Sequence, residues 1–354
     1  MKKFGLLLVT IILVLVFALS ACQPAAPVVE EPAAEAPAAE EAAQTDVLKV
    51  AALLPGSAND QSWSQIGYDG LMTIGEELGA ETAYTENAAV ADAMDALRDY
   101  ASRGFNLIIT HGGQYEEAVL AVADDYPETA FVVVSGSIGG KPNVSLATSN
   151  DQQIGFTEGW LAGKMSKTKK IGLVSHLEGM PVMDRINGSQ RIGAHAVDPE
   201  IEFCIIYIKD GEDVAAAREA AQTLIDGGAD VVFSEMNRGW QGVADAAKEA
   251  GVWTNSRDPS VADQYSDVLL FGIDYGFNGI YSELAKRYNE GNLKGENVDI
   301  GYHTPGSGFK FEFTENVPQE VLDSIQNEVI PYFLNEVPNS QLEVSPEDAK
   351  SGCD

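Results

Sequence analysis

The chain has 354 residues and a formal net charge of −32, from 54 acidic and 22 basic residues. Nucleic acid is excluded as a partner, because binding it requires Lys and Arg side chains that neutralise phosphates. The sequence contains no C-x-x-C pair and no cluster of His and Cys. We therefore expect neither a structural metal nor another cofactor.

The first residues form a secretory signal of the lipoprotein type. Two lysines precede an uncharged apolar run from Phe4 to Leu19, and two small residues then lead to Cys22. This order is typical of a signal peptide, here residues 1–21. A cysteine directly after the cleavage point predicts that Cys22 is lipidated and becomes the mature N-terminus. The alternative is a transmembrane anchor, although the run is slightly short of the about 20 residues that span a bilayer.

Residues 22–46 are predicted to be a disordered linker. After Cys22 they are almost entirely Ala, Pro, Glu and Gln, with four prolines, six acids and no basic residue. Such a stretch buries too little apolar surface to offset the entropy cost of ordering it. About 300 residues remain from Val47 onward, a length that suits two lobes rather than one core.

From Val47 the chain alternates between short apolar strands and helices. The expected strands occupy residues 47–55, 81–86, 107–110, 131–135, 171–175, 203–208, 231–234, 252–256 and 268–273. The expected helices occupy residues 62–78, 91–102, 115–125, 152–165, 183–196, 212–225, 239–250 and 276–290. This alternation predicts an α/β fold with two doubly wound lobes, each a parallel sheet covered by helices on both faces.

The ends of the expected strands are candidates for a ligand cleft, because ligands bind outside the carboxyl ends of strands in such sheets. Small or polar residues stand at 55–56, 111–112, 135–136, 175–176, 236–237 and 255–256. They are what a cleft for a polar ligand requires. Gly and Asn are also common in ordinary strand-to-helix turns, so each end by itself has two interpretations.

One stretch is more specific than this general pattern. Residues 55–65 read Pro-Gly-Ser-Ala-Asn-Asp-Gln-Ser-Trp-Ser-Gln, and residues 67–70 read Gly-Tyr-Asp-Gly. This resembles the first ligand loop of the basic membrane protein (BMP) family, which has Gly, a few residues, Asp, one residue, Ser, an aromatic and usually Asn. Further similar stretches lie at 126–131, 158–163, 193–200, 228–233 and 242–251.

The BMP family consists of lipoproteins related to the purine nucleoside receptor PnrA, which serve as solute-binding components of ABC importers. The resemblance implies a type I periplasmic-binding-protein fold with two lobes and three crossovers. Lobe 1 is expected to take residues 47–150 and 266–292, and lobe 2 residues 151–265 and 293–337. Residues 338–354 remain as a polar tail.

The resemblance assigns ligand contacts in the first loop. Trp63 occupies the place of the aromatic that stacks on a purine ring, although a core Trp at a helix start is the alternative. Asp60 is expected to accept hydrogen bonds from ligand N–H groups, or else to cap the helix that follows. Ser64 stands where the family usually has Asn, so that contact is shortened or replaced by water.

The second half departs from the nucleoside-binding members, in which an Asp and a Lys hold the ribose. Ser256 falls at the Asp position, unless a shift of two places Asp258 there, and no Lys follows the strand that ends at Ile273. The chain here resembles a branch that takes a free nucleobase. In that branch's pattern, Asp274 accepts from an exocyclic amine and Tyr275 packs on a ring edge, with a helix cap as the alternative role for Asp274.

The remaining candidates also follow expected strands. Trp240 is a candidate for a second aromatic wall facing the first. Asn237, next to Met236, offers a donor and an acceptor, as purine edges demand. His111 and Asn255 complete the expected ligand-binding set, although a lone His is often structural.

These features predict a receptor of an ABC importer that is lipid-anchored on the extracytoplasmic face of the cell membrane. It is expected to be a monomer that closes its lobes on a purine-like solute, a free nucleobase more than a nucleoside, and delivers it to a permease. The alternatives are a sensor that presents its ligand to a membrane kinase, and a binder of a sugar or another small polar solute. An enzyme is not expected, because the sequence has no nucleophile elbow, no H-E-x-x-H and no P-loop.

The other two cysteines leave one question open. Cys204 lies in an apolar strand pattern and is expected to be a small core residue, whereas Cys353 lies in the polar tail. The residues themselves neither favour nor exclude a bond between them.

Overall fold

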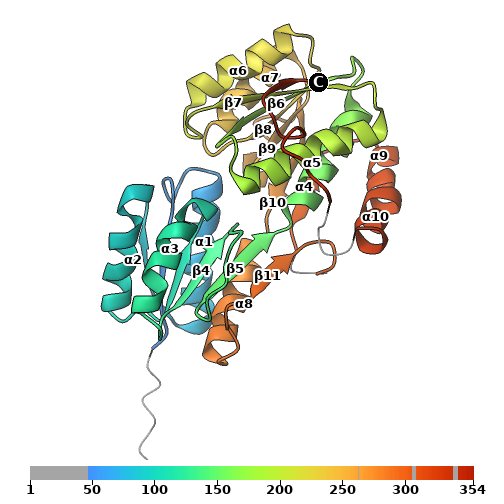
Figure 1. Cartoon of the computed structure of the whole chain (residues 1–354). Helices are drawn as coiled ribbons and strands as arrows, with labels where there is room; N and C mark the ends of the chain where they lie inside the picture. Colours follow the sequence, from blue (N-terminus) through green and yellow to red (C-terminus); the bar gives the residue numbers. More distant parts are fainter. Residues whose placement is uncertain (1–46, 262, 305–307, 338–341) are drawn as a thin grey trace, which may run out of the picture. The chain divides into compact units, whose positions relative to one another are not determined.

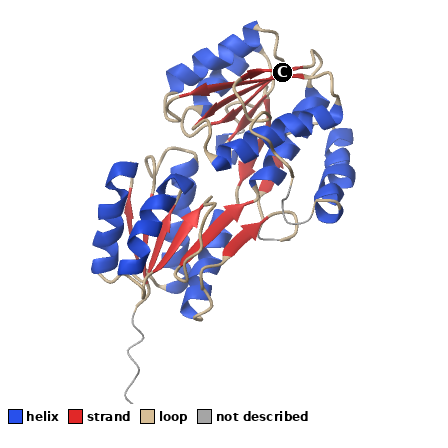
Figure 2. Cartoon of the chain, in the orientation of Figure 1, coloured by secondary structure: helices blue, strands red, loops and turns tan. Residues whose placement is uncertain are grey.

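The computed structural model describes residues 47–261, 263–304, 308–337 and 342–354 (Figure 1). The predicted signal peptide, the lipidated Cys22 and the linker lie outside these residues. Sheets flanked by helices make up the described part of the chain (Figure 2), which confirms the predicted α/β fold with parallel sheets. Among the described residues, no helix combines the length and the apolar character needed to span a bilayer.

The first sheet has six parallel strands in the order β11-β5-β4-β3-β1-β2. Its strands are β1 (Lys49–Leu53), β2 (Glu81–Thr85), β3 (Leu107–Thr110), β4 (Ala130–Val134), β5 (Val144–Ser149) and β11 (Asn297–Ile300). Its helices are α1 (Trp63–Leu78), α2 (Ala93–Ser102), α3 (Glu116–Val122) and α8 (Phe277–Asn289), with short 3-10 turns at Val90–Asp92, Gly113–Tyr115 and Ala123–Asp125. The sequence analysis did not predict β5.

The remaining strands form a second layered unit. β7 (Glu202–Ile208), β6 (Lys170–His176) and β8 (Val231–Glu235) are parallel neighbours. Three more strands follow: β9 (Thr254–Ser256), β10 (Leu269–Asp274) and β12 (Lys310–Phe313). β10 pairs in parallel with β9 and antiparallel with β12. A bridge between Val231 in β8 and Trp253, the residue before β9, connects the two groups of strands. The helices are α4 (Asp151–Met165), α5 (Pro181–Val197), α6 (Val214–Asp226), α7 (Trp240–Ala250), α9 (Gln319–Ser324) and α10 (Ile330–Asn335), with a 3-10 turn at Pro259–Val261 and a π turn at Ile325–Val329.

Two strands belong to a different sheet from the one that the sequence boundaries imply. β10 lies within residues 266–292, expected in lobe 1, yet it pairs with β9 and β12 of the second unit. β11 lies within residues 293–337, expected in lobe 2, yet it pairs with β5 of the first sheet. Both positions are decided by hydrogen bonds to strands far away in the sequence, which local patterns do not encode.

Successive side chains of its strands point into apolar cores on opposite faces, which explains why the first sheet is covered by helices on both faces. In β1, Val50 and Ala52 join one apolar core, whereas Ala51 and Leu53 join the core on the opposite face. All four side chains are fully buried. Such a strand reads as a continuous apolar run because neither of its faces meets water.

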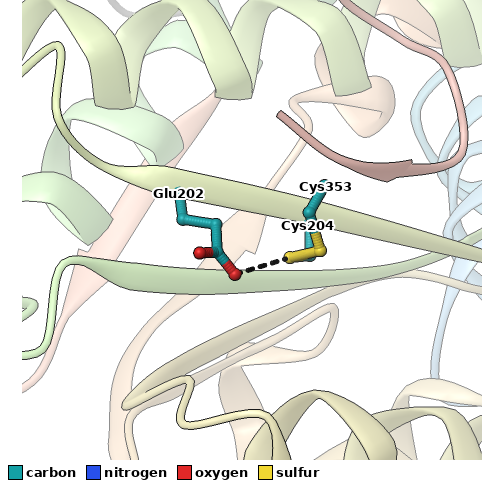
Figure 3. Close-up of side chains that lie close together, drawn as sticks. All are labelled: Glu202, Cys204 and Cys353. Carbon is teal, nitrogen blue, oxygen red and sulfur yellow. Dashed lines mark hydrogen bonds between the residues drawn. A yellow bond between two sulfur atoms is a disulfide. The ribbon is translucent and has the colours of Figure 1, made fainter.

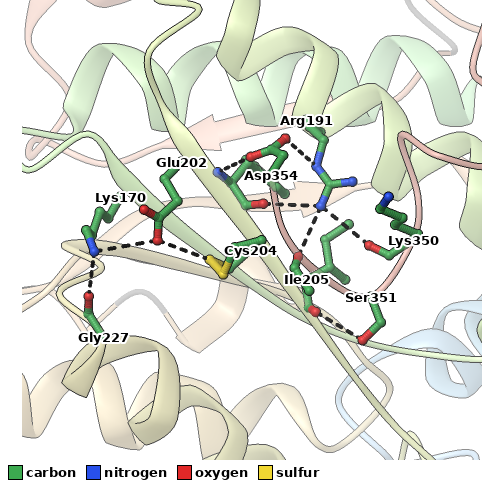
Figure 4. Close-up of a disulfide and its surroundings, with 12 residues drawn as sticks. Lys170, Arg191, Glu202, Cys204, Ile205, Gly227, Lys350, Ser351 and Asp354 are labelled. Carbon is green, nitrogen blue, oxygen red and sulfur yellow. Dashed lines mark hydrogen bonds and ion pairs between the residues drawn. A yellow bond between two sulfur atoms is a disulfide. The ribbon is translucent and has the colours of Figure 1, made fainter.

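The predicted polar tail is partly ordered, which corrects the expectation for Cys204. Cys204 forms a disulfide with Cys353 (Figure 3), and Gly352–Cys353 form β13, which pairs antiparallel with β7. Arg191 donates hydrogen bonds to the backbone carbonyls of Asp348 and Gly352 in this segment, at 2.8 and 3.2 Å. It also forms an ion pair with Asp354 at 3.0 Å (Figure 4). Residues 342–354 are therefore a strap along the outer edge of the second unit.

Candidate functional site

A cavity of about 250 Å³ lies where the carboxyl ends of strands from both units meet. Every loop that follows β1, β3, β4, β5, β6, β7, β8, β9 or β10 contributes to its wall. Its lining is Pro55, Ser62, Trp63, Gly112, Gly113, Gln114, Ser135, Ser149, Asp151, His176, Leu177, Met180, Val182, Met183, Ile186, Lys209, Asp210, Gly211, Glu212, Glu235, Met236, Asn237, Arg257, Tyr275 and Phe277. This is the place where doubly wound sheets bind their ligands.

Trp63 lines the cavity and is held rigidly by His111 behind it. The two rings stack with centroids 4.1 Å apart and 25° between their planes. Trp63 Nε1 donates to the His111 carbonyl at 3.0 Å, and His111 Nε2 donates to the Trp63 carbonyl at 2.8 Å. His111 Nδ1 accepts from the Tyr281 hydroxyl at 2.7 Å. His111 thus supports the indole ring but does not itself line the cavity.

His111 remains neutral in this position. It is fully buried, and burial lowers the pKa of its imidazole to about 3. The neutral ring matches its hydrogen bonds, since Nε2 faces a carbonyl and must carry the proton, whereas Nδ1 accepts. Gly67 makes room for the ring, because a Cβ at that position would lie 2.6 Å from it.

Aromatic and aliphatic side chains cover most of the remaining wall. The rings of Tyr275 and Phe277 meet Trp63 edge-on, with centroids 5.9 and 5.3 Å away. The segment that leads into α5 adds Leu177, Met180, Val182, Met183 and Ile186. Such a wall suits a flat, largely apolar ligand with a few polar groups at its edge.

Polar groups are concentrated at two points of the cavity. Asn237 Nδ2 donates to Glu212 Oε1 at 2.8 Å, and burial raises the pKa of Glu212. At the second point, Asp151 forms an ion pair with Arg185 at 2.8 Å, while burial raises the pKa of Asp151 to about 6. Near it, the buried Ser149 hydroxyl has no hydrogen-bond partner among the described residues.

A buried charge network closes the floor of the site. The Arg257 guanidinium is paired with Glu235 and, at 3.2 Å, with Glu158. Gln190 Nε2 donates to both carboxylates at 2.7 and 2.8 Å. Burial raises the pKa of Glu158 well above its usual value. The Arg257 charge is thus already balanced by protein groups.

Four predicted ligand contacts line the cavity, namely Trp63, Met236, Asn237 and Tyr275. Trp240 does not form the expected second wall. It is 1% exposed, and its Nε1 donates to the Gln61 carbonyl at 3.2 Å, so it connects α7 to the first loop.

The other predicted contacts have local structural roles. Asp60 accepts from the backbone N–H groups of Ser62 and Ser64 at 2.8 and 3.0 Å, the capping role named as the alternative. Ser64 Oγ accepts from the Gly56 backbone at 2.8 Å. Asp274 accepts from the Gly276 backbone at 2.8 Å, a bond within the turn before α8 rather than the helix cap named as the alternative.

Two more of the predicted contacts are turned away from the cavity. Asn255 is fully buried and bonds to the Ser234 backbone at 2.9 Å. The Ser256 hydroxyl donates to the Asp258 carbonyl at 2.7 Å.

Several lining residues were missed because their neighbours in space are distant in sequence. Gln114, Ser149, Glu212 and Arg257 carry no motif of their own. For Gln114, Glu212 and Arg257 the usable signal was position, since each follows a strand within four residues, whereas Ser149 ends the unpredicted strand β5. His176 was noted as a strand end, and the structure places it in the cavity wall.

The fold and this cleft define the class of the protein: it is a solute-binding protein of the periplasmic-binding type. A family model described as "ABC transporter substrate-binding protein PnrA-like" matches residues 47–346. The chain therefore belongs to this family, Bmp, as the resemblance predicted.

Individual relatives and solved structures agree with this assignment. "Transcriptional activator protein med" of Bacillus subtilis is 28% identical over 248 residues, covering 70% of this chain and 77% of that protein. "Putative ABC transporter glucose-binding protein TsgA13" of Haloferax volcanii is 26% identical over 284 residues, covering 80% and 71%. The structure of an ABC transporter solute-binding protein from Conexibacter woesei has a TM-score of 0.66 and 20% identity, covering 83% of this chain and 99% of that one.

Proposed function

We propose that this protein is the extracytoplasmic receptor of an ABC importer for a purine-like solute, with a free nucleobase as its ligand. The observation that carries the proposal is Trp63, whose indole lines the cavity while His111 fixes its other side. A flat aromatic face held without rotational freedom is what stacking on a planar ring requires.

The mostly apolar wall favours a nucleobase over a sugar. A sugar carries a hydroxyl on nearly every carbon, and each buried hydroxyl needs a hydrogen-bond partner. The wall near α5 offers side chains such as Met180, Val182 and Ile186 instead. The name of the Haloferax relative makes glucose the main competing ligand, so glucose is included in the calorimetry with Trp63→Ala.

The groups at the ribose positions favour a free base over a nucleoside. In the family's nucleoside-binding pattern an Asp and a Lys hold the ribose hydroxyls. Here Ser256 stands at the Asp position, and its hydroxyl bonds to the Asp258 carbonyl. Asp274 is the last residue of β10, and its side chain accepts a hydrogen bond within the turn before α8. Neither side chain lines the cavity, which supports the loss of a ribose contact.

The position on the membrane follows from the N-terminal sequence. A lipid on Cys22 would hold the receptor near its permease, and the acidic Ala/Pro linker up to residue 46 would set its reach. Labelling cells with a radioactive fatty acid tests this step: wild type should incorporate the label, whereas Cys22→Ala should not. Equal incorporation by the two would refute lipidation at Cys22.

Calorimetry with Trp63→Ala tests the proposed site. Loss of the stacking face is expected to weaken binding of a purine base about 5- to 150-fold, because one base–aromatic stack contributes about 1–3 kcal/mol. Trp160→Ala is the matched control, since Trp160 is also half-buried but lies on α4 outside the cavity. Purine, guanosine, ribose and glucose are titrated side by side. Binding of glucose without any purine binding would refute the proposal, and unchanged affinity of Trp63→Ala would remove Trp63 from the site.

A further inference from the structure

The polar wall of the cavity consists mainly of hydrogen-bond acceptors. Asp210 and Glu212, in the loop after β7, both line it, and so does His176 at the end of β6. Two donors of the lining are already directed at protein groups, whereas the Ser149 hydroxyl, which can donate or accept, has no partner among the described residues. Trp63 Nε1 donates to a backbone carbonyl at 3.0 Å, and Arg257 is paired with Glu235 and Glu158. The exposed Lys209 is the remaining cation of the lining.

His176 presents a lone pair rather than a proton on Nε2. Its Nδ1 lies 2.9 Å from the Glu235 carbonyl, and a carbonyl only accepts, so Nδ1 carries the proton. Burial lowers the pKa of His176, which keeps the ring neutral. Nε2 is therefore an acceptor, and none of the described residues donates a hydrogen bond to it.

Glu212 is a carboxylate held by N–H groups instead of by a cation. Asn237 Nδ2 donates to its Oε1 at 2.8 Å, and the Arg238 backbone donates as well. Asp60 and Asp210 lie near enough to act on it by charge. Its Oε1 also faces the first loop, because a Cβ on Gly56 would lie 2.8 Å from it. An N–H group of a ligand would be stabilised there, whereas a carbonyl oxygen would be repelled.

We infer that the wall formed by Glu212, Asn237 and His176 selects a ligand that presents N–H donors, and that among purine bases it favours an aminopurine over an oxopurine. This rests on the proposed function. Glu212 also orients Asn237, because a carboxylate draws the Nδ2 end of the amide and leaves Oδ1 directed elsewhere as a further acceptor. An adenine-type exocyclic amine offers two N–H donors to these acceptors, whereas hypoxanthine places the acceptor O6 at that position and carries its N–H donor at N1.

Calorimetry with adenine and hypoxanthine tests the inference, since the two bases differ in the group at C6 and in whether N1 carries a proton. Wild-type protein is expected to bind adenine at least about tenfold more tightly, because a site built for an N–H group penalises a ligand that leaves its acceptors unpaired. Glu212→Gln offers a donor as well as an acceptor, so it is expected to reduce this preference about tenfold or more. Glu219→Gln removes the same charge from the exposed face of α6 and should keep the wild-type ratio.

The outcomes separate this inference from the proposed function. Equal or tighter binding of hypoxanthine by wild type would overturn the inference while leaving a purine receptor. An unchanged adenine preference in Glu212→Gln would overturn the role of Glu212. Binding of glucose with no binding of either base would overturn the proposed function itself. The wild-type comparison needs no variant, so a folding defect in Glu212→Gln would not remove the test.

Discussion

At the scale of single residues, the site depends on a pair that local sequence does not reveal. Trp63 and His111 are 48 residues apart, yet each donates a hydrogen bond to the backbone of the other. The sequence analysis placed both in the ligand set, one by resemblance and one by its strand end. The structure separates their positions: Trp63 lines the cavity, and His111 holds it in place from the buried side.

Replacing His111 is expected to change the pH dependence of stability. Burial lowers the pKa of His111 from its ordinary value of 6.5 to about 3 in the folded protein. The unfolded chain therefore binds this proton first, so the contribution of His111 is complete above about pH 6.5 and is lost as the pH falls toward 3. In His111→Phe, two polar groups also lose their partner, which costs about 1–3 kcal/mol each at neutral pH.

Urea unfolding between pH 7 and pH 4 measures this effect. The stability gap between wild type and His111→Phe is expected to narrow as the pH falls. Asp151, whose raised pKa of about 6 gives the opposite slope, is present in both proteins and cancels in the difference. His303→Asn, which removes an exposed histidine, is the control variant measured alongside. A constant gap for His111→Phe would show that His111 titrates normally.

At the scale of secondary-structure elements, the sequence predicted what depends on local pattern. The alternation of strands and helices, and the returning helix at 276–290, correspond to elements of the structure. β5 was missed because Ser145, Thr148 and Ser149 interrupt its apolar pattern. The sheet membership of β10 and β11 depends on distant pairing. The disulfide likewise joins residues separated by 149 positions. The local sequence therefore could not predict either the sheet to which β10 and β11 belong or the disulfide.

The C-terminal strap gives a prediction at this scale. β13 covers the outer edge of β7, and an uncovered edge strand is a place where chains associate. Cys353→Ser removes the bond that closes this long loop, which is expected to lower the free energy of unfolding by about 2–4 kcal/mol. Ligand affinity should not change, because neither cysteine lines the cavity.

Thermal unfolding with and without a reducing agent provides the control. Reduction is expected to lower the midpoint of wild type to that of Cys353→Ser and to leave the variant unchanged. A wild-type midpoint that is insensitive to complete reduction would mean that the bond adds no stability. Light scattering after reduction should also increase, since the β7 edge is then exposed.

At the scale of the whole molecule, hydrogen bonds join loops that come from the two sheets. In the loop after β1, the Gln61 carbonyl accepts a hydrogen bond from the indole N–H of Trp240. The Gln61 side chain also accepts from Gln241 at 3.0 Å. Ser62 Oγ lies 3.5 Å from the Met236 carbonyl. These bonds link α7 and the loop after β8 to the loop after β1. A hinged receptor needs such contacts if a ligand is to hold its two halves together.

The family, the cavity and the N-terminal sequence agree with the role of a solute receptor at the membrane. The family consists of ABC transporter substrate-binding proteins, whose partners are a small solute and a permease. The cavity is largely apolar, and the predicted lipid anchor and linker would keep the receptor beside the membrane. The central claim is therefore about the ligand, because the fold alone serves solutes of many kinds.

Mass spectrometry of the ligand released from natively purified protein tests that claim most directly. The protein is denatured only after extensive washing, and the released small molecules are compared with those from Trp63→Ala, treated identically. The account predicts a purine base, an aminopurine in particular, in the wild-type sample and little of it in the variant. A hexose or another sugar in near-equimolar amount, with no purine, would contradict the account.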